Sequence, residues 1–169
     1  MLDRVLQNFM VLLYQIPWVK DRWAKRYSIA AAEMIPWAPL SKPLSQCRIA
    51  LITTGGVHLK TEKPFDMTDK DGDPSYREIP SSAAQNELVI THDYYNHDDA
   101  DKDINLVLPI EILKEAQTAG WVGESAPSFY GLMGHVDKEH VKTLTQETAS
   151  AIVSQLIKEE VDVVLMIPA

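Results

Sequence analysis

The chain has 169 residues, of which 46% are hydrophobic and 24% are charged, as in one globular domain with a sizeable core. The 16 basic and 24 acidic residues give a net charge of -8, which argues against a nucleic-acid partner because phosphate binding needs a concentrated positive face. The single cysteine, Cys47, excludes an internal disulfide and a multi-cysteine metal site. It fits a reducing compartment, so we expect a soluble, cytoplasmic protein.

Residues 1–38 are predicted to form an N-terminal helical arm. Apolar side chains recur at helical spacing over residues 2–15, and Pro17 ends or kinks that run. The longest apolar stretch is shorter than the roughly 20 residues that span a bilayer, so no membrane span is expected. The basic, aromatic residues 18–27 would suit a membrane surface. Packing of the arm on the domain or on a second subunit is favoured, because the apolar face is short.

Residues 39–169 are predicted to form an α/β domain. The expected elements are strands over residues 48–54, 87–91 and 161–167, a strand or extended turn over 126–134, a helix from Pro109 to Gly120, and a helix N-capped by Asp137 that runs to about residue 160. Residues 59–86 form a long polar loop of a kind that is often functional. This alternation predicts a three-layer fold, with helices on both faces of a mainly parallel sheet.

Polar side chains gather where the predicted strands end, and ligands bind at the carboxyl ends of strands in such sheets. Of the 5 histidines, His58 follows the first strand, His92 ends the second, His97 lies close behind, and His135 follows the third. Asp93 stands next to His92. This pattern is open to three interpretations: a zinc or iron site, acid–base catalysis, or a hydrogen-bonded loop with an acidic, solvated rim.

Three other motifs are predicted to be structural. Residues 53–58 contain a glycine turn that could face an anion, but a simple tight turn is favoured. Residues 69–73 suggest a calcium loop, yet their glycine is at the wrong offset and Pro80 stands where the closing glutamate belongs. Cys47 precedes the first strand, opposite the expected site, and is predicted to be a packed side chain rather than a nucleophile.

Five stretches of the chain together resemble one protein family. They are PLSKPL at residues 39–44, IALITTGGVH at 49–58, GDPSYREIP at 72–80, THDYYNHDDADKDIN at 91–105 and GLMGH at 131–135. They resemble the selenoprotein B family, the substrate-specific subunits of the glycine, sarcosine, betaine and D-proline reductases. The resemblance runs from about Pro39 to the end of the sequence.

The resemblance implies a redox centre at the carboxyl edge of the sheet. In the family a selenocysteine or cysteine, usually paired with a cysteine two residues away, follows a strand like residues 161–167. Its selenolate is thought to displace the amine of the substrate, and the selenoether passes to a partner protein. The residues expected around it are His58, His92, Asp93, His97 and His135. An apolar strand is an unusual terminus, so the chain is predicted to be a truncated piece, or a shortened product whose selenocysteine codon was taken as a stop.

The leading prediction is an oxidoreductase subunit for thiol- or selenol-dependent reductive cleavage of a small amine or amino-acid-like substrate. It needs no bound cofactor, and it implies a partner redox or acceptor protein. One alternative is a catalytically inert module for small-molecule binding or assembly. The other is a metal-dependent enzyme that uses His92, Asp93 and His97. A homo-oligomer built through the N-terminal arm is compatible with each.

Overall fold

The computed structural model of the protein describes residues 16–19, 21–22 and 38–169. By its internal contacts the chain divides between Pro39 and Leu40, and all elements named below belong to the second unit. The helical arm predicted over residues 1–38 falls largely outside the described residues and stays a prediction. None of the described helices has the length and apolarity that crossing a membrane requires.

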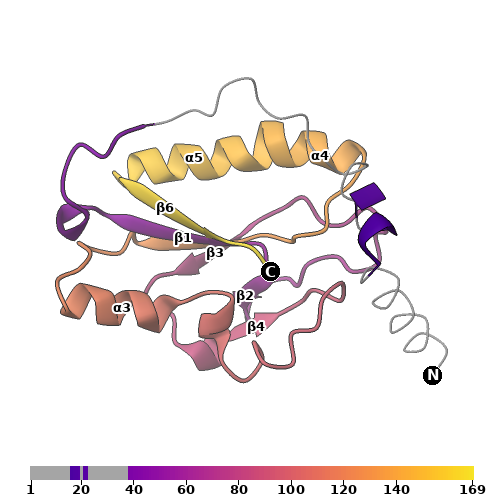
Figure 1. The fold of residues 1–169 in the computed structure, drawn as a ribbon, viewed down its shortest axis with the longest axis horizontal. Coiled ribbons are helices and arrows are strands. Elements are labelled where there is room, and N and C mark those ends of the chain that lie inside the picture. The colour runs from indigo at the N-terminus through magenta and orange to yellow at the C-terminus, as the bar shows by residue number, and fades with distance from the viewer. Residues whose placement is uncertain (1–15, 20, 23–37) are drawn as a thin grey trace. The chain divides into compact units, whose positions relative to one another are not determined.

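The main sheet has four strands in the order β3-β5-β1-β6 (Figure 1). β1 (Ile49–Thr53) pairs in parallel with β5 (Ser128–Gly131) on one side and with β6 (Val163–Ile167) on the other. β3 (Arg77–Pro80) pairs antiparallel with β5 at one edge. All residues of β1 are buried, as a parallel strand between two neighbours should be. The predicted α/β class with a mainly parallel sheet is therefore confirmed.

The two longer helices, α3 and α5, each bury apolar side chains against the core. α3 (Ile110–Thr118) begins directly after Pro109, as predicted. α4 (Glu139–Thr143) continues through a π-helical segment, Leu144–Thr148, into α5 (Ala149–Lys158). In Figure 1, α5 runs above β6 and β1, and α3 lies below them. The buried side chains are Ile110 and Leu113 in α3 and Ile152 and Leu156 in α5, and all four belong to the core cluster that includes β1.

A second, two-stranded sheet corrects the expected strand arrangement. β2 (Val57–Leu59) pairs antiparallel with β4 (Leu88–Ile90), so the strand predicted over residues 87–91 exists but is no neighbour of β1. Gly56 turns the chain from β1 into β2 with a φ of 70°, and a Cβ there would lie 2.6 Å from the carbonyl oxygen of Thr91. Only glycine adopts this conformation readily and lets the two segments meet this closely.

The polar segment predicted as a loop over residues 59–86 contains β3, which the prediction missed. Within β3 only Ile79 is buried, and Pro80 ends the strand. An edge strand with one buried side chain carries almost no hydrophobic alternation, and proline is tolerated there because no ladder partner needs its missing N–H.

The N-cap predicted at Asp137 is also wrong. The residue before α4 is Lys138, which has a φ of 51° and makes no side-chain cap. The Asp137 backbone N–H instead donates to the carbonyl of Asp71, at 2.8 Å. Asp137 is therefore bonded to the polar loop just before α4 begins.

β6 is more exposed than its apolar sequence predicts. The side chains of Val164, Leu165 and Met166 are 37%, 49% and 63% exposed, whereas Val163 and Ile167 are partly buried against the core. Within residues 38–169, β6 pairs with β1 along one edge only. Its other edge and much of its apolar surface face outward.

Candidate functional site

Four segments of the chain meet at the carboxyl edge of the main sheet. Thr54 follows β1, and its hydroxyl accepts the backbone N–H of Ala169, beyond β6, at 3.2 Å. Gly134 follows β5, and a Cβ on Gly134 would lie 3.2 Å from the Thr54 carbonyl and 3.3 Å from Nε2 of His92, which follows β4. We call the residues gathered here the carboxyl-edge cluster: Thr54, His92, Tyr94, Tyr95, Gly134 and His135.

His92 is the buried centre of the cluster, with a side chain that faces two backbone donors. Its Nε2 atom accepts the N–H of Gly134 at 3.1 Å, and its Nδ1 atom lies 3.3 Å from the N–H of Tyr94. A neutral imidazole has one nitrogen with a free lone pair, so it accepts one of these groups fully. The shorter contact selects Nε2 as that acceptor.

The surroundings of His92 favour the neutral ring. Burial is the main cause that lowers its pKa below the ordinary value of 6.5, and the nearby His135 lowers the pKa further. Protonation would also remove the lone pair that the Gly134 N–H uses. His92 is therefore placed to accept a hydrogen bond as a neutral ring rather than to carry a charge.

Aromatic rings connect His92 to two other predicted site residues. The Tyr94 ring lies 5.9 Å from the His92 ring and 4.2 Å from the His135 ring, measured between centroids. The Tyr95 ring lies 5.0 Å from the His92 ring and 5.5 Å from the His97 ring. The structure thus brings His92, His97 and His135 together through two tyrosines.

Replacing Tyr95 with phenylalanine should lower the free energy of unfolding by about 1 kcal/mol. The Tyr95 hydroxyl donates to the carbonyl of Gly55 at 3.0 Å, and the substitution leaves that partly buried acceptor without its partner. Urea unfolding monitored by circular dichroism measures the loss. Tyr94→Phe is the matched control, because the Tyr94 side chain is 50% exposed and its change should stay within about 0.5 kcal/mol. Equal losses in both variants would contradict the assigned hydrogen bond.

Asp93 and His97 lie at the rim of the cluster. Asp93 is exposed beside His92, and its charge opposes the lowering of the His92 pKa. The Nδ1 atom of His97 lies 2.8 Å from a carboxylate oxygen of Asp101, four residues further along the chain. Their predicted catalytic roles stay predictions.

His58 occupies a different place from the other predicted residues. It lies in β2, is 2% exposed, and packs edge-on against Phe65. Its Nδ1 atom donates to the carbonyl of Leu59 at 2.8 Å, and Nε2 accepts from the Thr91 hydroxyl at 2.9 Å. Both ring nitrogens are satisfied, so His58 links β2 to the end of β4 just before His92.

The cluster offers no evident metal centre. In the part of the chain that the structure describes, no three His, Cys, Asp or Glu side chains are arranged to hold a metal ion. Both nitrogens of His92 face N–H groups, and His97 is engaged with Asp101. The alternative of a metal-dependent enzyme that uses His92, Asp93 and His97 therefore gains no support.

Cys47 lies at the amino end of β1, away from the cluster, as predicted. Its side chain is fully buried, and the thiol lies 3.4 Å from the carbonyl oxygen of Pro43. A thiol packed in this way is a small core side chain rather than an accessible nucleophile.

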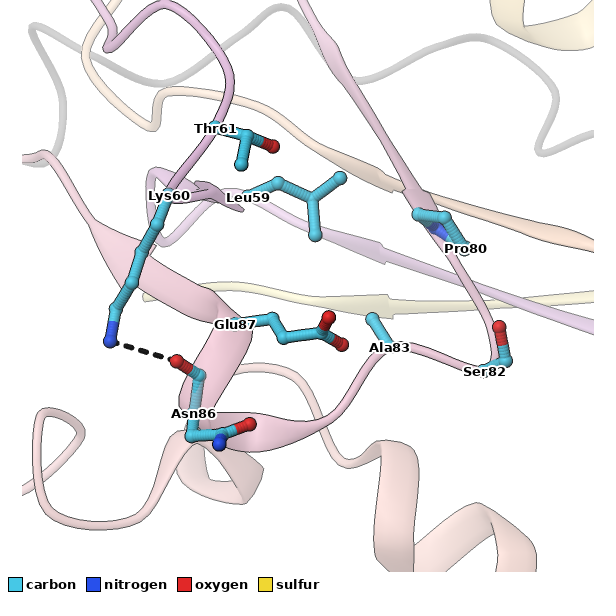
Figure 2. Close-up of a pocket in the computed structure, with 8 residues that line it drawn as sticks. All are labelled: Leu59, Lys60, Thr61, Pro80, Ser82, Ala83, Asn86 and Glu87. Carbon is cyan, nitrogen blue, oxygen red and sulfur yellow. Dashed lines mark hydrogen bonds between the residues drawn. The ribbon is translucent and has the colours of Figure 1, made fainter.

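A cavity of about 450 Å³ lies at the other end of the small sheet (Figure 2). The residues that line it are Leu59, Lys60, Thr61, Pro80, Ser82, Ala83, Asn86 and Glu87. Leu59 pairs with Leu88, so the cavity is at the opposite end of the β2–β4 pair from Thr91 and His92. Figure 2 shows Lys60 donating to the carbonyl of Asn86, at 2.8 Å, so the charge of Lys60 is already engaged. This cavity does not extend the carboxyl-edge cluster.

Sequence reasoning missed several members of the cluster. The stretches that carry the family resemblance contain Thr54, Tyr94 and Tyr95. They were not predicted because the site prediction selected histidines, whose side chains titrate near neutral pH. Gly134 contributes its backbone N–H, a group that every residue except proline has, so the residue type does not indicate this role. A search for polar or glycine residues at the last position of each predicted strand would have found Thr54 and Gly134.

Comparisons with known proteins agree on one family. A family model described as glycine/sarcosine/betaine reductase selenoprotein B matches residues 11–169. The D-proline reductase subunit gamma of Acetoanaerobium sticklandii is 36% identical over 130 residues, which cover 77% of this chain and 52% of that protein. The glycine reductase complex component B subunit gamma of Symbiobacterium thermophilum is 24% identical over 150 residues, 86% of this chain and 34% of that protein.

The sarcosine reductase complex component B subunit beta of Peptoclostridium acidaminophilum is 23% identical over 121 residues, 68% of this chain and 27% of that protein. The chain thus spans 52% of the length of the D-proline reductase subunit and 34% or less of the other two. No solved structure matches the chain significantly.

Proposed function

Since the chain belongs to the glycine/sarcosine/betaine reductase selenoprotein B family, we propose that it is part of an oxidoreductase subunit that cleaves a small amine or amino-acid-like substrate reductively. The observation that carries the proposal is the contact between the Ala169 amide and the Thr54 hydroxyl. This contact brings the end of β6 to the cluster. A cysteine or selenocysteine that followed β6 would therefore lie near His92. The relatives are named as reductase subunits or components, which supports a reductase-related role.

The proposed reaction is a two-electron reduction. The carbon–nitrogen bond of the substrate breaks and a carbon–hydrogen bond forms. The nitrogen leaves as a protonated amine, or it stays attached where that bond is part of a ring. Two thiols, or a thiol and a selenol, supply the electrons and two protons and are oxidised to a disulfide or selenenylsulfide. Such chemistry needs a deprotonated, nucleophilic chalcogen, and a reducing compartment such as the cytoplasm keeps it available.

Residues of the cluster have distinct proposed roles. His92, neutral and buried, is a positioning residue: its Nε2 atom accepts the Gly134 N–H and so holds the segment after β5 beside the place proposed for the thiol or selenol. Tyr94 and His135, whose rings are in contact at a tilt of 31°, form an aromatic wall beside it, against which a small substrate is held. Asp93 and His97 stay candidates for orienting the substrate at the rim. A partner redox protein then reduces the disulfide or selenenylsulfide back to its thiol or selenol form.

The reactive chalcogen is proposed to come from outside residues 1–169. Cys47 is the single cysteine of the sequence, and it is buried away from the cluster. Family resemblance implies that a cysteine or selenocysteine follows a strand like β6. Sequencing the source gene past the codon for Ala169 tests this. A UGA or cysteine codon there, with a second cysteine codon three positions away, supports the proposal, and a stop or a continuation without either contradicts it.

Ligand binding tests the cluster itself. Glycine, sarcosine, betaine and D-proline are titrated separately into the isotopically labelled protein while the imidazole signals of His92 and His135 are followed by NMR. At least one probe should shift both signals saturably and leave the signal of His58, buried in β2, unchanged. No shift with any probe would remove the substrate role. Binding together with a gene that lacks the redox codons would instead favour the catalytically inert binding module.

A further inference from the structure

The polar loop between β2 and β3 grips the segment that leads from β5 into α4. The backbone carbonyl of Lys70 accepts from Nε2 of His135 at 3.0 Å, and the carbonyl of Asp71 accepts from the N–H of Asp137 at 2.8 Å. We call residues 69–72 the latch loop. One of its partners, His135, is a member of the carboxyl-edge cluster, so the latch loop touches the proposed site directly.

Two ion pairs close the latch loop over the same segment. The Asp71 carboxylate lies 2.6 Å from Nζ of Lys138, and the Asp69 carboxylate lies 2.9 Å from Nε2 of His140. Lys138 and His140 are only two residues apart, yet their partners lie on the latch loop nearly 70 residues earlier. Contacts with the latch loop are thus spread over residues 135–140. His135 is held at the start of this segment and His140 at its end.

The backbone of the latch loop is in direct contact with the backbone of residues 135–136. Gly72 forms an antiparallel bridge with Val136. Gly72 has a φ of 84°, and a Cβ there would lie 1.8 Å from the carbonyl oxygen of His135. A displacement of the latch loop must therefore move the backbone of His135 as well.

The residues that follow the latch loop anchor it to the domain. The Asp73 carboxylate lies 3.5 Å from Arg77, and these two side chains are only 13% and 11% exposed. The Arg77 guanidinium sits 4.3 Å above the Phe65 ring, and the carbonyl of Pro74 accepts from the Thr148 hydroxyl at 2.7 Å. These contacts fix the position of the latch loop on the domain.

We propose that Asp69 and Asp71 are positioning residues of the carboxyl-edge cluster, because by holding residues 135–140 they fix the His135 ring against Tyr94. The importance of this placement for substrate handling rests on the proposed function, whereas the placement itself does not. The long polar loop, predicted as functional but without a role, thereby acquires one.

The Asp69–His140 contact makes the latch sensitive to pH. The hydrogen bond from His140 lowers the pKa of Asp69, and the same bond raises the pKa of His140 above 6.5. Asp71 and Asp73 also face His140 and raise its pKa, while Lys138 faces Asp69. The stability that His140 contributes is full below pH 6.5 and is lost as the pH rises through its raised pKa. The contribution of Asp69 is lost in acid, as the pH falls through its lowered pKa.

NMR of the 169-residue chain tests the positioning directly. In the unmodified protein we expect a nuclear Overhauser contact between the Tyr94 and His135 rings, and a His135 signal shifted by the ring current of Tyr94. The double variant Asp69→Asn/Asp71→Asn should lose both signatures without global unfolding. Asp66→Asn is the matched control, because the Asp66 carboxylate bonds to Thr68 within the same loop. It should keep both signatures.

A second variant separates positioning from simple loop structure. In the unmodified protein the His135 signal should show an inflection at the pKa of His140, and His140→Gln should abolish that inflection. An unchanged ring contact in the double variant, or an inflection that survives His140→Gln, would overturn the proposal. These signals need no substrate and no redox residue, so they fail or succeed independently of the ligand titrations that test the proposed function.

Discussion

Replacing Gly131 with alanine should lower the free energy of unfolding by about 3 kcal/mol or more, or prevent folding altogether. Gly131 ends β5, where the main sheet meets β2. A Cβ there would lie 1.9 Å from the carbonyl oxygen of Val57 and 3.1 Å from its carbonyl carbon. Both atoms belong to buried backbone, so no flexible side chain can move aside. Urea unfolding followed by circular dichroism measures the loss.

Gly120→Ala is the matched control for this substitution. Gly120 ends α3 with a φ of 73°, but nothing lies within 4 Å of the position that its Cβ would take. The control should therefore cost only the backbone strain of a left-handed alanine, about 1–2 kcal/mol. If Gly131→Ala were no more destabilising than Gly120→Ala, the close approach of β5 to β2 would be wrong.

Replacing His92 with phenylalanine should destabilise the protein by about 1–3 kcal/mol at pH 7 and abolish ligand-induced changes in the cluster. Phenylalanine keeps a flat ring but offers no acceptor to the N–H groups of Gly134 and Tyr94. Thermal unfolding and the ligand titrations measure the two effects. His97→Phe is the matched control for the stability effect alone, because that ring is at the rim and its contact with Asp101 is a surface pair worth about 0–1 kcal/mol.

The same variant should lose a part of the protein's acid sensitivity. The folded-state pKa of His92 is lowered, so below pH 6.5 the unfolded state takes up the proton first and stability falls until the pH passes the folded-state pKa. Unfolding measured from pH 7.5 down to pH 4.5 should show this fall in the unmodified protein and a shallower one in His92→Phe. The window lies below pH 6.5, whereas the His140 effect lies above it, so the two titrations are separable. A fall of equal steepness in both proteins would show that His92 is not the group responsible.

The elements with strong local signals were predictable from the sequence. β1, α3 and β6 were expected close to their observed bounds, because apolar runs and the flanking proline and glycine mark them. The pairing of β4 with β2 was not predictable, since a buried run of three residues looks the same in a parallel sheet and in a small antiparallel pair. The edge strand β3 was not predicted, because only one of its four side chains is buried and its sequence shows no alternation of apolar and polar residues.

The candidate site divides in the same way. The rule that ligands bind at the carboxyl ends of strands located His92 and His135, because it depends on strand order along the chain alone. It also selected His58, which follows a glycine turn but points into the β2–β4 pair. The contacts of Asp69 and Asp71 with residues 138–140 join distant segments, and no local pattern reports such pairs. Tertiary packing decided these positions.

The exposed edge of β6 has a practical consequence for anyone who purifies this chain. Natural sheets protect their edges with lysine, proline or bulges, and the five residues Val163–Ile167 contain none of these protections. Among the described residues the second edge of β6 has no strand partner, and an uncharged strand edge of this kind can pair with other molecules at high protein concentration. The spectroscopic experiments above therefore belong at the lowest workable concentration, with light scattering alongside. A charged side chain at Met166, which at 63% is the most exposed residue of β6, is the least disruptive way to keep samples dispersed.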